Sequence, residues 1–296
     1  MERPDNIIDF VPDAKHFPFE SHWFNSSAGP IHYIDEGDGR PLVLFHGNPD
    51  WSFLYRKIVR ALRGHFRCIA MDYPGFGLSA HPDESYGYTS AEHAAVIREL
   101  VEHLDLKDAV FMGQDWGGPI GIDVASRMPQ RVGGLVMGNT WYWPADGFVM
   151  NFFSRLMGSP PLQSLITKRN FFVSPLMRRS LKAKLSEAEF DHYAAVVPTP
   201  ESRRGIAEFP KEIRSSKPWM SELEKRVEST LGDKPMVLIW GMKDPAFGRG
   251  GILKRWTTAF PQAKVIRLED AGHYIQEDAP EQIAAAIYDA YGPGVT

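Results

Sequence analysis

Short apolar runs alternate regularly with longer amphipathic segments along this chain, and this pattern limits the folds that it can adopt. The runs are near-continuous in apolar residues, which is typical of strands buried on both faces of a parallel sheet. Alternating strands and helices indicate a doubly wound α/β fold. We predict strands at 30–37, 41–47, 66–72, 109–115, 132–139, 234–244 and 263–270, and helices at 90–104, 117–128, near 251–259 and at 280–291.

Two local details of this pattern can be predicted as well. The runs 30–37 and 41–47 are separated by a short connection that contains glycine, so we expect a hairpin that leads into the sheet. Ser90 is expected to be the N-cap of helix 90–104, because a serine side chain accepts a hydrogen bond from the free N–H groups of the first turn.

Residues 140–215 interrupt the alternation with aromatic-rich segments that read as helices and contain no predicted strand. We therefore expect a core domain, 1–139 with 216–296, and an inserted helical cap, 140–215. Ligands of open α/β sheets bind at the carboxyl ends of the strands, and a cap there would enclose an apolar chamber. Bulky residues expected to line or support this chamber, or alternatively to pack within the cap, are Trp141, Phe152, Phe153, Met157, Phe171 and Phe172.

The composition is that of an ordinary globular protein, with 296 residues of which 43% are hydrophobic and 24% charged. The net charge of −4 argues against nucleic acid or an anionic membrane as the main partner. The basic run 178–184 is interpreted as a solvated helix face, because Glu187 follows it closely.

The single cysteine, Cys68, lies in an apolar run, so we expect a buried thiol and no disulfide within the chain. That cysteine usage fits a cytoplasmic location. The N-terminal segment has no apolar core of the kind found in secretory signals, and no apolar run reaches the ~18 residues that a membrane span needs.

Polar residues that carry chemistry follow four of the predicted strands. The segment "GQDWG" has the spacing of the G-x-S-x-G nucleophile elbow, with Asp115 in place of serine. Asp244 and His273 follow the last two strands, which gives the order nucleophile, acid, histidine. Each residue alone could be a cap, turn or core residue, but their joint occurrence at one sheet edge predicts a catalytic triad. The fourth segment, "HGNPDW", contains Asn48.

The sequence offers no pattern for a metal or a cofactor. It contains neither H-E-x-x-H nor a cysteine–histidine spacing suited to zinc. No G-x-G-x-x-G follows a strand, and the segment "YPGFGLS" lacks the lysine of a phosphate loop. We therefore expect a reaction that needs no cofactor and no metal ion.

Five segments together resemble the haloalkane dehalogenases of the α/β-hydrolase superfamily: "HGNPDWSFLYRK", "DYPGFGLS", "GQDWGGPIG", "WGMKD" and "GHYIQEDAP". The resemblance covers about residues 20–290 and implies the α/β-hydrolase fold, a mostly parallel sheet flanked by helices with a helical cap. It implies that Asp115 is the nucleophile, His273 the base and Asp244 the acid. The implied halide-binding residues are Trp116 and Asn48.

A carboxylate nucleophile suits this chemistry, because it is ionised at pH 7 and can displace halide from a saturated carbon. The implied reaction converts a haloalkane to an alcohol and halide through an alkyl ester on Asp115. The implied partners are a small apolar halogenated substrate and halide, with no nucleic acid and no membrane. Homo-oligomerisation is left open.

An aspartate at the elbow is also found in other enzyme classes, so the sequence leaves alternatives to a haloalkane dehalogenase. Epoxide hydrolases share it but usually have an aromatic residue at the position of Asn48, and they need two cap tyrosines, for which Tyr142 and Tyr193 are candidates. Fluoroacetate dehalogenases typically carry arginine where Trp116 stands. A serine esterase is disfavoured because the chain has no G-x-S-x-G. A catalytically silent binding protein would have lost a triad member, and none is missing.

Overall fold

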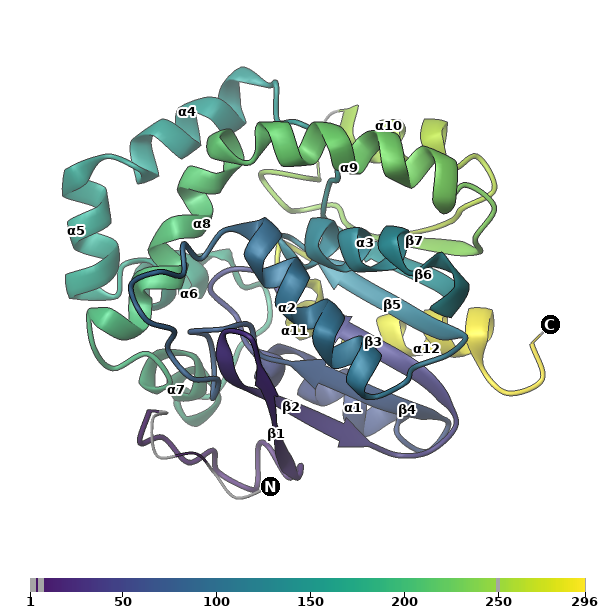
Figure 1. Cartoon of the computed structure of the whole chain (residues 1–296), viewed down its shortest axis with the longest axis horizontal. Helices are drawn as coiled ribbons and strands as arrows, with labels where there is room; N and C mark the ends of the chain where they lie inside the picture. The colour runs from purple at the N-terminus through teal and green to yellow at the C-terminus, as the bar shows by residue number, and fades with distance from the viewer. Residues whose placement is uncertain (1–3, 5–7, 249–250, 296) are drawn as a thin grey trace.

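A computed structural model describes residues 4, 8–248 and 251–295 of the chain. Its centre is an eight-stranded sheet of order β1-β2-β4-β3-β5-β6-β7-β8 (Figure 1). β1 and β2 run antiparallel to their neighbours, and every other neighbouring pair is parallel. The strands are β1 (Ser21–Ser26), β2 (Gly29–Glu36), β3 (Arg40–Phe45), β4 (Phe66–Met71), β5 (Ala109–Gln114), β6 (Val132–Gly138), β7 (Met236–Gly241) and β8 (Lys264–Leu268).

The predicted hairpin between the runs 30–37 and 41–47 is wrong. β2 pairs with β1 and β4, whereas β3 lies between the parallel strands β4 and β5. The hairpin partner of β2 is β1, and the tight turn of that hairpin contains Gly29 with a φ of 96°. Gly37, in the connection to β3, packs so closely on Arg63, in the turn before β4, that a Cβ would lie 2.0 Å from the Arg63 carbonyl oxygen. The chain therefore crosses over a strand at this point instead of folding back beside it.

Helices cover both faces of the sheet, as the doubly wound pattern predicts. α1, α11 and α12 pack together on one face, and α2, α3 and α9 pack on the other (Figure 1). The helices outside residues 140–215 are η1 (Ser52–Tyr55), α1 (Arg56–Leu62), α2 (Ser90–His103), α3 (Gly117–Arg127), η2 (Pro129–Arg131), α9 (Lys217–Thr230), α10 (Gly251–Ala259), α11 (Ile275–Asp278) and α12 (Pro280–Tyr291).

The N-cap of α2 is Thr89, not the predicted Ser90. The Thr89 hydroxyl accepts the backbone N–H of Glu92, and the Glu92 carboxylate accepts the backbone N–H of Thr89, which forms a capping box. Ser90 is the first helical residue, and its N–H donates to buried Glu212 of α8. The reciprocal Thr-x-x-Glu pattern is stronger than a lone serine, because it satisfies two backbone donors instead of one.

Residues 140–215, which we call the helical insertion, lie between β6 and β7 and contain only helices and loops. In Figure 1 their helices lie on the left of the view, from α4 at the top to α7 lower down, beyond the edge of the sheet. The division of the chain into a core and a cap at 140 and 215 stays a prediction. The helices of this segment are α4 (Phe148–Met157), α5 (Pro160–Arg169), the π-helical η3 (Phe172–Met177), α6 (Arg178–Ser180), α7 (Glu187–Ala195), η4 (Glu201–Arg203) and α8 (Arg204–Ser215).

Cys68 lies on β4 and is fully buried, as predicted. Burial raises the pKa of its thiol to about 12, because the surrounding apolar side chains disfavour the thiolate. In the described part of the chain, no helix has the length and apolar character that a membrane span requires.

Candidate active site

The elbow predicted around Asp115 is a sharp turn between β5 and α3. Asp115 has a left-handed backbone with a φ of 50°, a conformation that aspartate tolerates better than most residues. Gly113 and Gly117 allow the strand and the helix to meet: a Cβ on Gly117 would lie 2.0 Å from the carbonyl oxygen of Phe45. The Thr140 hydroxyl donates to the Asp115 carbonyl at 2.6 Å. The turn is therefore held by sterics and by a hydrogen bond from the end of β6.

The carboxylate of Asp115 is held by backbone groups. Its Oδ2 accepts the N–H of Asn48 at 3.0 Å, and the backbone of Trp116 donates to the same carboxylate. Gly47 makes this approach feasible, since a Cβ there would lie 2.7 Å from the Asp115 Cβ. Burial raises the pKa of Asp115, while His273 and the two N–H groups partly offset that rise. Oδ1 lies on the side of His273, whose Nε2 is 4.0 Å away.

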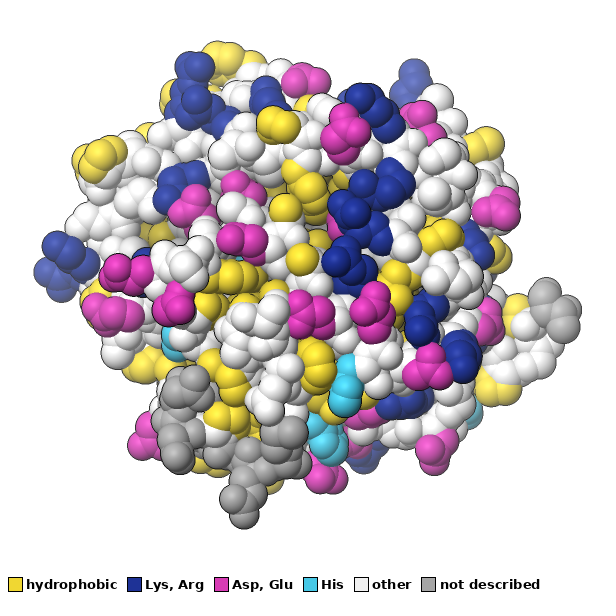
Figure 2. Space-filling view, viewed as in Figure 1, with side chains coloured by type: hydrophobic (Ala, Val, Ile, Leu, Met, Phe, Trp, Pro, Cys, Tyr) yellow, Lys and Arg dark blue, Asp and Glu magenta, His cyan; other side chains and the backbone are white. Residues whose placement is uncertain are grey.

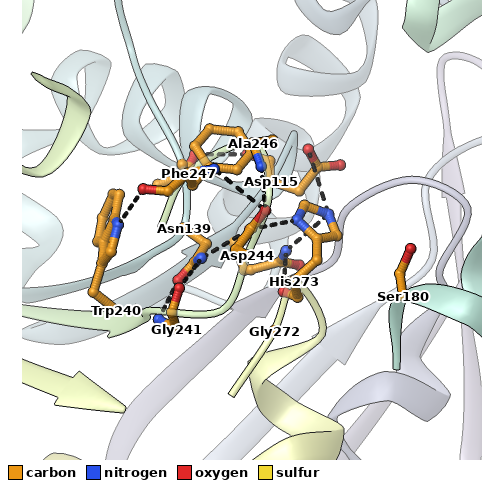
Figure 3. Close-up of polar contacts among 12 residues, drawn as sticks. Asp115, Asn139, Ser180, Trp240, Gly241, Asp244, Ala246, Phe247, Gly272 and His273 are labelled. Carbon is orange, nitrogen blue, oxygen red and sulfur yellow. Dashed lines mark hydrogen bonds and ion pairs between the residues drawn. The ribbon is translucent and has the colours of Figure 1, made fainter. Parts of the chain in front are cut away.

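His273 stands in the loop between β8 and α11, between the two carboxylates (Figure 3). Its Nδ1 lies 2.8 Å from Asp244 Oδ2, and its Nε2 lies 4.0 Å from Asp115 Oδ1. Burial disfavours the imidazolium, but the charges of Asp244 and Asp115 outweigh burial and raise the pKa of His273 to about 9. The structure thus brings together the three residues predicted as a triad.

Asp244 follows β7 and is almost fully buried. Its Oδ1 accepts the N–H of Ala246 at 2.8 Å and of Phe247 at 3.2 Å. Its Oδ2 accepts the side-chain amide of Asn139 at 2.8 Å in addition to His273. Burial alone would raise the pKa of Asp244, but His273 and these donors lower it below its usual value. The carboxylate is therefore fixed and ionised behind the imidazole.

The two predicted halide-binding residues flank the Asp115 carboxylate. The indole N–H of Trp116 donates to no acceptor among the described residues, and its ring borders the same cavity as Asp115. Asn48 borders that cavity too. One N–H of its amide donates to the Ile206 carbonyl at 3.2 Å, which leaves the other N–H free and sets which end of the amide is the donor.

Asp115, Trp116, Asn48, Asp244 and His273 all line one cavity of about 310 Å³, which we call the chamber. Its walls are mainly apolar, a setting that strengthens polar contacts inside it. Of the bulky residues expected there, Trp141, Phe153 and Phe172 line it, whereas Phe171 and Met157 pack behind the wall. Phe152 does neither: 56% of it is exposed on the outside of α4.

The two tyrosines considered for an epoxide hydrolase do not line the chamber. Tyr142 is buried against Trp143 and Trp256, and the Tyr193 hydroxyl donates to buried Glu277. Both rings are packed in the protein interior, so neither hydroxyl is placed to donate a proton to a ligand of Asp115.

Three polar residues near the triad were missed by the sequence analysis. Asn139 bridges Asp244 and the backbone of Gly241, and Gln114 Nε2 lies 3.3 Å from His273 Nε2. The carboxyl of Asp50 is buried with no partner for either oxygen, and burial raises its pKa well above the usual value. Asn139 had a usable signal, because it directly follows a strand at the same sheet edge as the triad.

Among the described residues, no group of histidine, cysteine or carboxylate side chains is arranged to hold a metal ion.

Comparisons with known proteins show the family to which the chain belongs. A model of the alpha/beta hydrolase fold matches residues 40–280. The chain is 53% identical to haloalkane dehalogenase 2 of Mycobacterium tuberculosis over 285 residues, which cover 96% of this chain and 99% of the relative. It is 31% identical to a cis-3-alkyl-4-alkyloxetan-2-one decarboxylase of Shewanella oneidensis, with 91% of this chain and 87% of the relative covered.

A solved structure agrees with these sequence matches. The crystal structure of haloalkane dehalogenase DbeA from Bradyrhizobium elkani matches with a TM-score of 0.82 at 26% identity, covering 92% of this chain and 97% of that chain. The predicted α/β-hydrolase fold is thereby confirmed. With more than half of its residues identical to a relative of nearly the same extent, this protein belongs to the haloalkane dehalogenase family of the α/β-hydrolase fold.

Proposed function

We propose that the protein hydrolyses the carbon–halogen bond of small apolar haloalkanes, giving an alcohol and a halide ion. In the first step a carboxylate oxygen of Asp115 attacks the halogen-bearing carbon from the side opposite the halogen. A carbon–oxygen bond forms, the carbon–halogen bond breaks, and the halogen leaves with the bonding electron pair. The product of this step is an alkyl ester on Asp115.

The geometry of Asp115 supports this role. The backbone N–H of Asn48 holds Oδ2, while Oδ1 lies on the side of His273, 4.0 Å from its Nε2. We assign the attack to Oδ1, because the lone pairs of Oδ2 are engaged by that hydrogen bond. The left-handed backbone and the neighbouring glycines fix its direction.

The departing halide needs charge stabilisation and no proton, because halides are weak bases. The free indole N–H of Trp116 and the free amide N–H of Asn48 can supply it. By analogy with a donor of an oxyanion hole, each would lower the barrier by about 3 kcal/mol. Both donors act in a chamber with apolar walls, where such contacts are stronger than in water.

In the second step His273 removes a proton from water, and the resulting hydroxide adds to the carbonyl carbon of the ester. The negative charge on the carbonyl oxygen is received by the backbone N–H of Asn48, which holds Oδ2, and by the backbone N–H of Trp116, which donates to the same carboxyl group. When this intermediate collapses, the bond between the carboxyl carbon and the alkyl oxygen breaks, and the imidazolium of His273 returns its proton to that oxygen, which leaves as the alcohol. The carboxyl group of Asp115 then loses its remaining proton to solvent, which restores the carboxylate. Asp244 stabilises the imidazolium throughout.

The charges around His273 support this order of steps. In the free enzyme the carboxylates of Asp244 and Asp115 raise the pKa of His273 to about 9. Esterification removes the charge of Asp115, so one of the two charges that hold the proton disappears. The pKa of His273 therefore falls when the ester forms, which is when a base is needed.

The observation that carries the proposal is a carboxylate at the elbow that faces an apolar chamber beside two free N–H donors. A halide-release assay with chlorinated, brominated and iodinated alkanes of three to six carbons tests it, and we expect stoichiometric halide and alcohol. Release of diol from terminal epoxides without halide turnover would instead identify an epoxide hydrolase. The position of Tyr142 and Tyr193 in the protein interior argues against that alternative.

The partners proposed here are a small halogenated molecule and halide, without nucleic acid. We also propose a cytoplasmic location, which the single cysteine with its buried thiol supports.

A further inference from the structure

The charge of this protein is distributed unevenly along the chain. Residues 147–186 hold seven lysine and arginine residues and no aspartate or glutamate, in a chain whose net charge is −4. The remainder is therefore strongly acidic. All seven basic side chains are exposed: Arg155, Lys168, Arg169, Arg178, Arg179, Lys182 and Lys184. Such segregation indicates a surface that attracts an anionic partner, although the net charge of the whole chain has the opposite sign.

Most of these cations have no internal partner. Arg178 forms a bidentate pair with Glu187, at 2.7 and 2.9 Å. The other six make no ion pair with any described carboxylate. Acidic residues of neighbouring segments are engaged elsewhere, since Glu208 of α8 pairs with Lys211 and Asp146 pairs with Lys217. The positive charge of the segment is therefore uncompensated on the protein surface.

Exposed apolar side chains lie on α4 and α5, the two helices that carry Arg155, Lys168 and Arg169. Phe148 is 82% exposed and Phe152 56% exposed on α4, and their rings stack on each other. Val149, Leu156 and, on α5, Leu165 are also exposed. Large apolar residues grouped on one surface mark an interaction site more often than isolated ones do. We call these five residues, with Arg155, Lys168 and Arg169, the α4–α5 face.

Figure 2 shows hydrophobic and basic side chains together over α4 and α5. A helix that combines bulky apolar side chains with flanking Lys and Arg is suited to the boundary between lipid headgroups and acyl chains. We propose that the α4–α5 face docks on an anionic phospholipid surface, with Phe148, Phe152 and Leu156 entering the headgroup layer. Arg155, Lys168 and Arg169 then contact lipid phosphates.

Two other occupants fit this face less well. A symmetric dimer through it would bring the basic residues of both copies, Arg155, Lys168 and Arg169, into one interface, with no carboxylate in 147–186 to compensate them. Nucleic acid would leave the aliphatic Val149, Leu156 and Leu165 without a suitable contact. The expectation of no membrane partner rested on the net charge of the whole chain, and that argument does not apply to a segment of opposite charge.

The α4–α5 face adjoins the chamber. Val149 is 73% exposed and also lines the chamber, together with Met150 and Phe153 of the same helix. A lipid-docked α4 would therefore hold this wall of the chamber at the membrane surface, where apolar haloalkanes accumulate. The docking itself does not depend on the proposed function, so its test needs no substrate.

The experiment is sedimentation of the full chain with extruded vesicles, either phosphatidylcholine alone or with about one third phosphatidylserine. We expect binding to the anionic vesicles only, and its loss at 0.5 M salt. The triple variant Arg155→Gln/Lys168→Gln/Arg169→Gln should bind at least tenfold more weakly, because each basic residue near an anionic surface contributes about fivefold. The variant Phe148→Ser/Phe152→Ser should lose a similar amount through its apolar contacts.

The matched control is Lys254→Gln/Lys264→Gln/Arg267→Gln, which removes the same charge from exposed positions on α10 and β8. We expect its vesicle binding to stay within threefold of the wild type. Melting temperatures check that all variants are folded. Absence of wild-type binding, or equal losses in the control, would overturn the proposal. So would binding that ignores the phenylalanines but extends to duplex DNA, or a dimer in light scattering that Phe148→Ser/Phe152→Ser dissociates without any vesicle binding.

Discussion

The sheet-edge loops and the helical insertion both line the chamber, but they are built on different principles. In the loops, backbone groups fix the reacting side chains: Asn48 N–H holds Asp115, and Ala246 and Phe247 N–H hold Asp244. The insertion contributes apolar side chains such as Phe153, held only by packing. The chemistry thus resides in a few rigid hydrogen-bonded groups, whereas the shape of the chamber depends on side chains that can be exchanged.

The largest expected effect comes from changing Asp115, in the sheet-edge loops. Asp115→Ala removes the attacking oxygen, and nothing else in the chamber can form the ester, so halide release should fall by at least about 10⁴-fold. An ion-selective electrode or a chloride assay under steady-state conditions measures it. Asp83→Ala, at an exposed loop position, is the control and should leave the rate unchanged. Retention of more than one per cent of the rate by Asp115→Ala would refute the nucleophile assignment.

His273→Gln separates the two steps of the reaction. Without a base the ester cannot be hydrolysed, so turnover should fall by about 10³-fold or more while the first step continues. Rapid quenching should reveal a burst of one halide per chain, and mass spectrometry should find an alkyl group on the peptide that contains Asp115. The exposed His65→Gln serves as the control. Continued multiple turnover by His273→Gln would mean that another group is the base.

Trp116→Phe tests the halide contact with the ring almost preserved. Loss of one N–H donor should slow carbon–halogen cleavage by about 100-fold and weaken halide binding. Stopped-flow fluorescence with bromide and single-turnover halide release measure both quantities. Trp219→Phe, on α9 away from the chamber, controls for loss of an indole. Equal halide affinity in Trp116→Phe and the wild type would contradict the assigned role.

Two adjacent phenylalanines of the helical insertion test whether its side chains determine the shape of the chamber. Phe153 lines the chamber and Phe152 points to solvent. Phe153→Ala should change kcat/KM about tenfold and shift the preference towards longer haloalkanes, because the chamber becomes larger. Phe152→Ala should stay within twofold on soluble substrates. Similar kinetic changes in both variants would show that the chamber wall does not determine the preference.

The smallest effect concerns the buried carboxyl of Asp50. Burial raises the pKa of Asp50 well above 3.8, so its protonated form is favoured by folding and stability is lost as pH rises above that value. Asp50→Asn removes this loss. We expect its melting temperature to exceed that of the wild type by about 2–4 °C at pH 8, with the difference closing below about pH 4. Calorimetry as a function of pH measures this, and a pH-independent difference would show that Asp50 does not titrate as inferred.

Much of the fold could be predicted, because the central strands β3, β5, β6 and β7 are mainly apolar runs and the polar site residues follow such runs. The polar edge strand β1 was not predicted, because it lacks this pattern. The elbow, the order of Asp115, Asp244 and His273, and helix 280–291 all came from such local patterns. The position of β2 could not be predicted, because strand order depends on long-range pairing. The outward orientation of Phe152 could not be predicted either, since two adjacent phenylalanines, Phe152 and Phe153, do not indicate which of them faces inward.

The candidate site shows the same division. Residues proposed to act through a motif, such as Trp116 after the elbow aspartate, were proposed from their position in that motif. Asn139 acts by joining Asp244 to the backbone of Gly241, a contact between two loops about a hundred residues apart. The sequence around Asn139 does not indicate that contact, although its position directly after β6 places it at the same sheet edge as Asp115.

Gly113 and Gly117, on either side of Asp115, lie in close contact with the backbones of α3 and β3, and Gly47 packs against the Asp115 side chain. The turn therefore has little room to relax when that side chain is exchanged. The scaffold therefore presents whatever group occupies position 115 at the same point and in the same direction. Changing the reaction then requires a new functional group and new chamber walls, but no new frame. A relative named as a decarboxylase, 31% identical over most of this chain, is what such a reusable frame would lead one to expect.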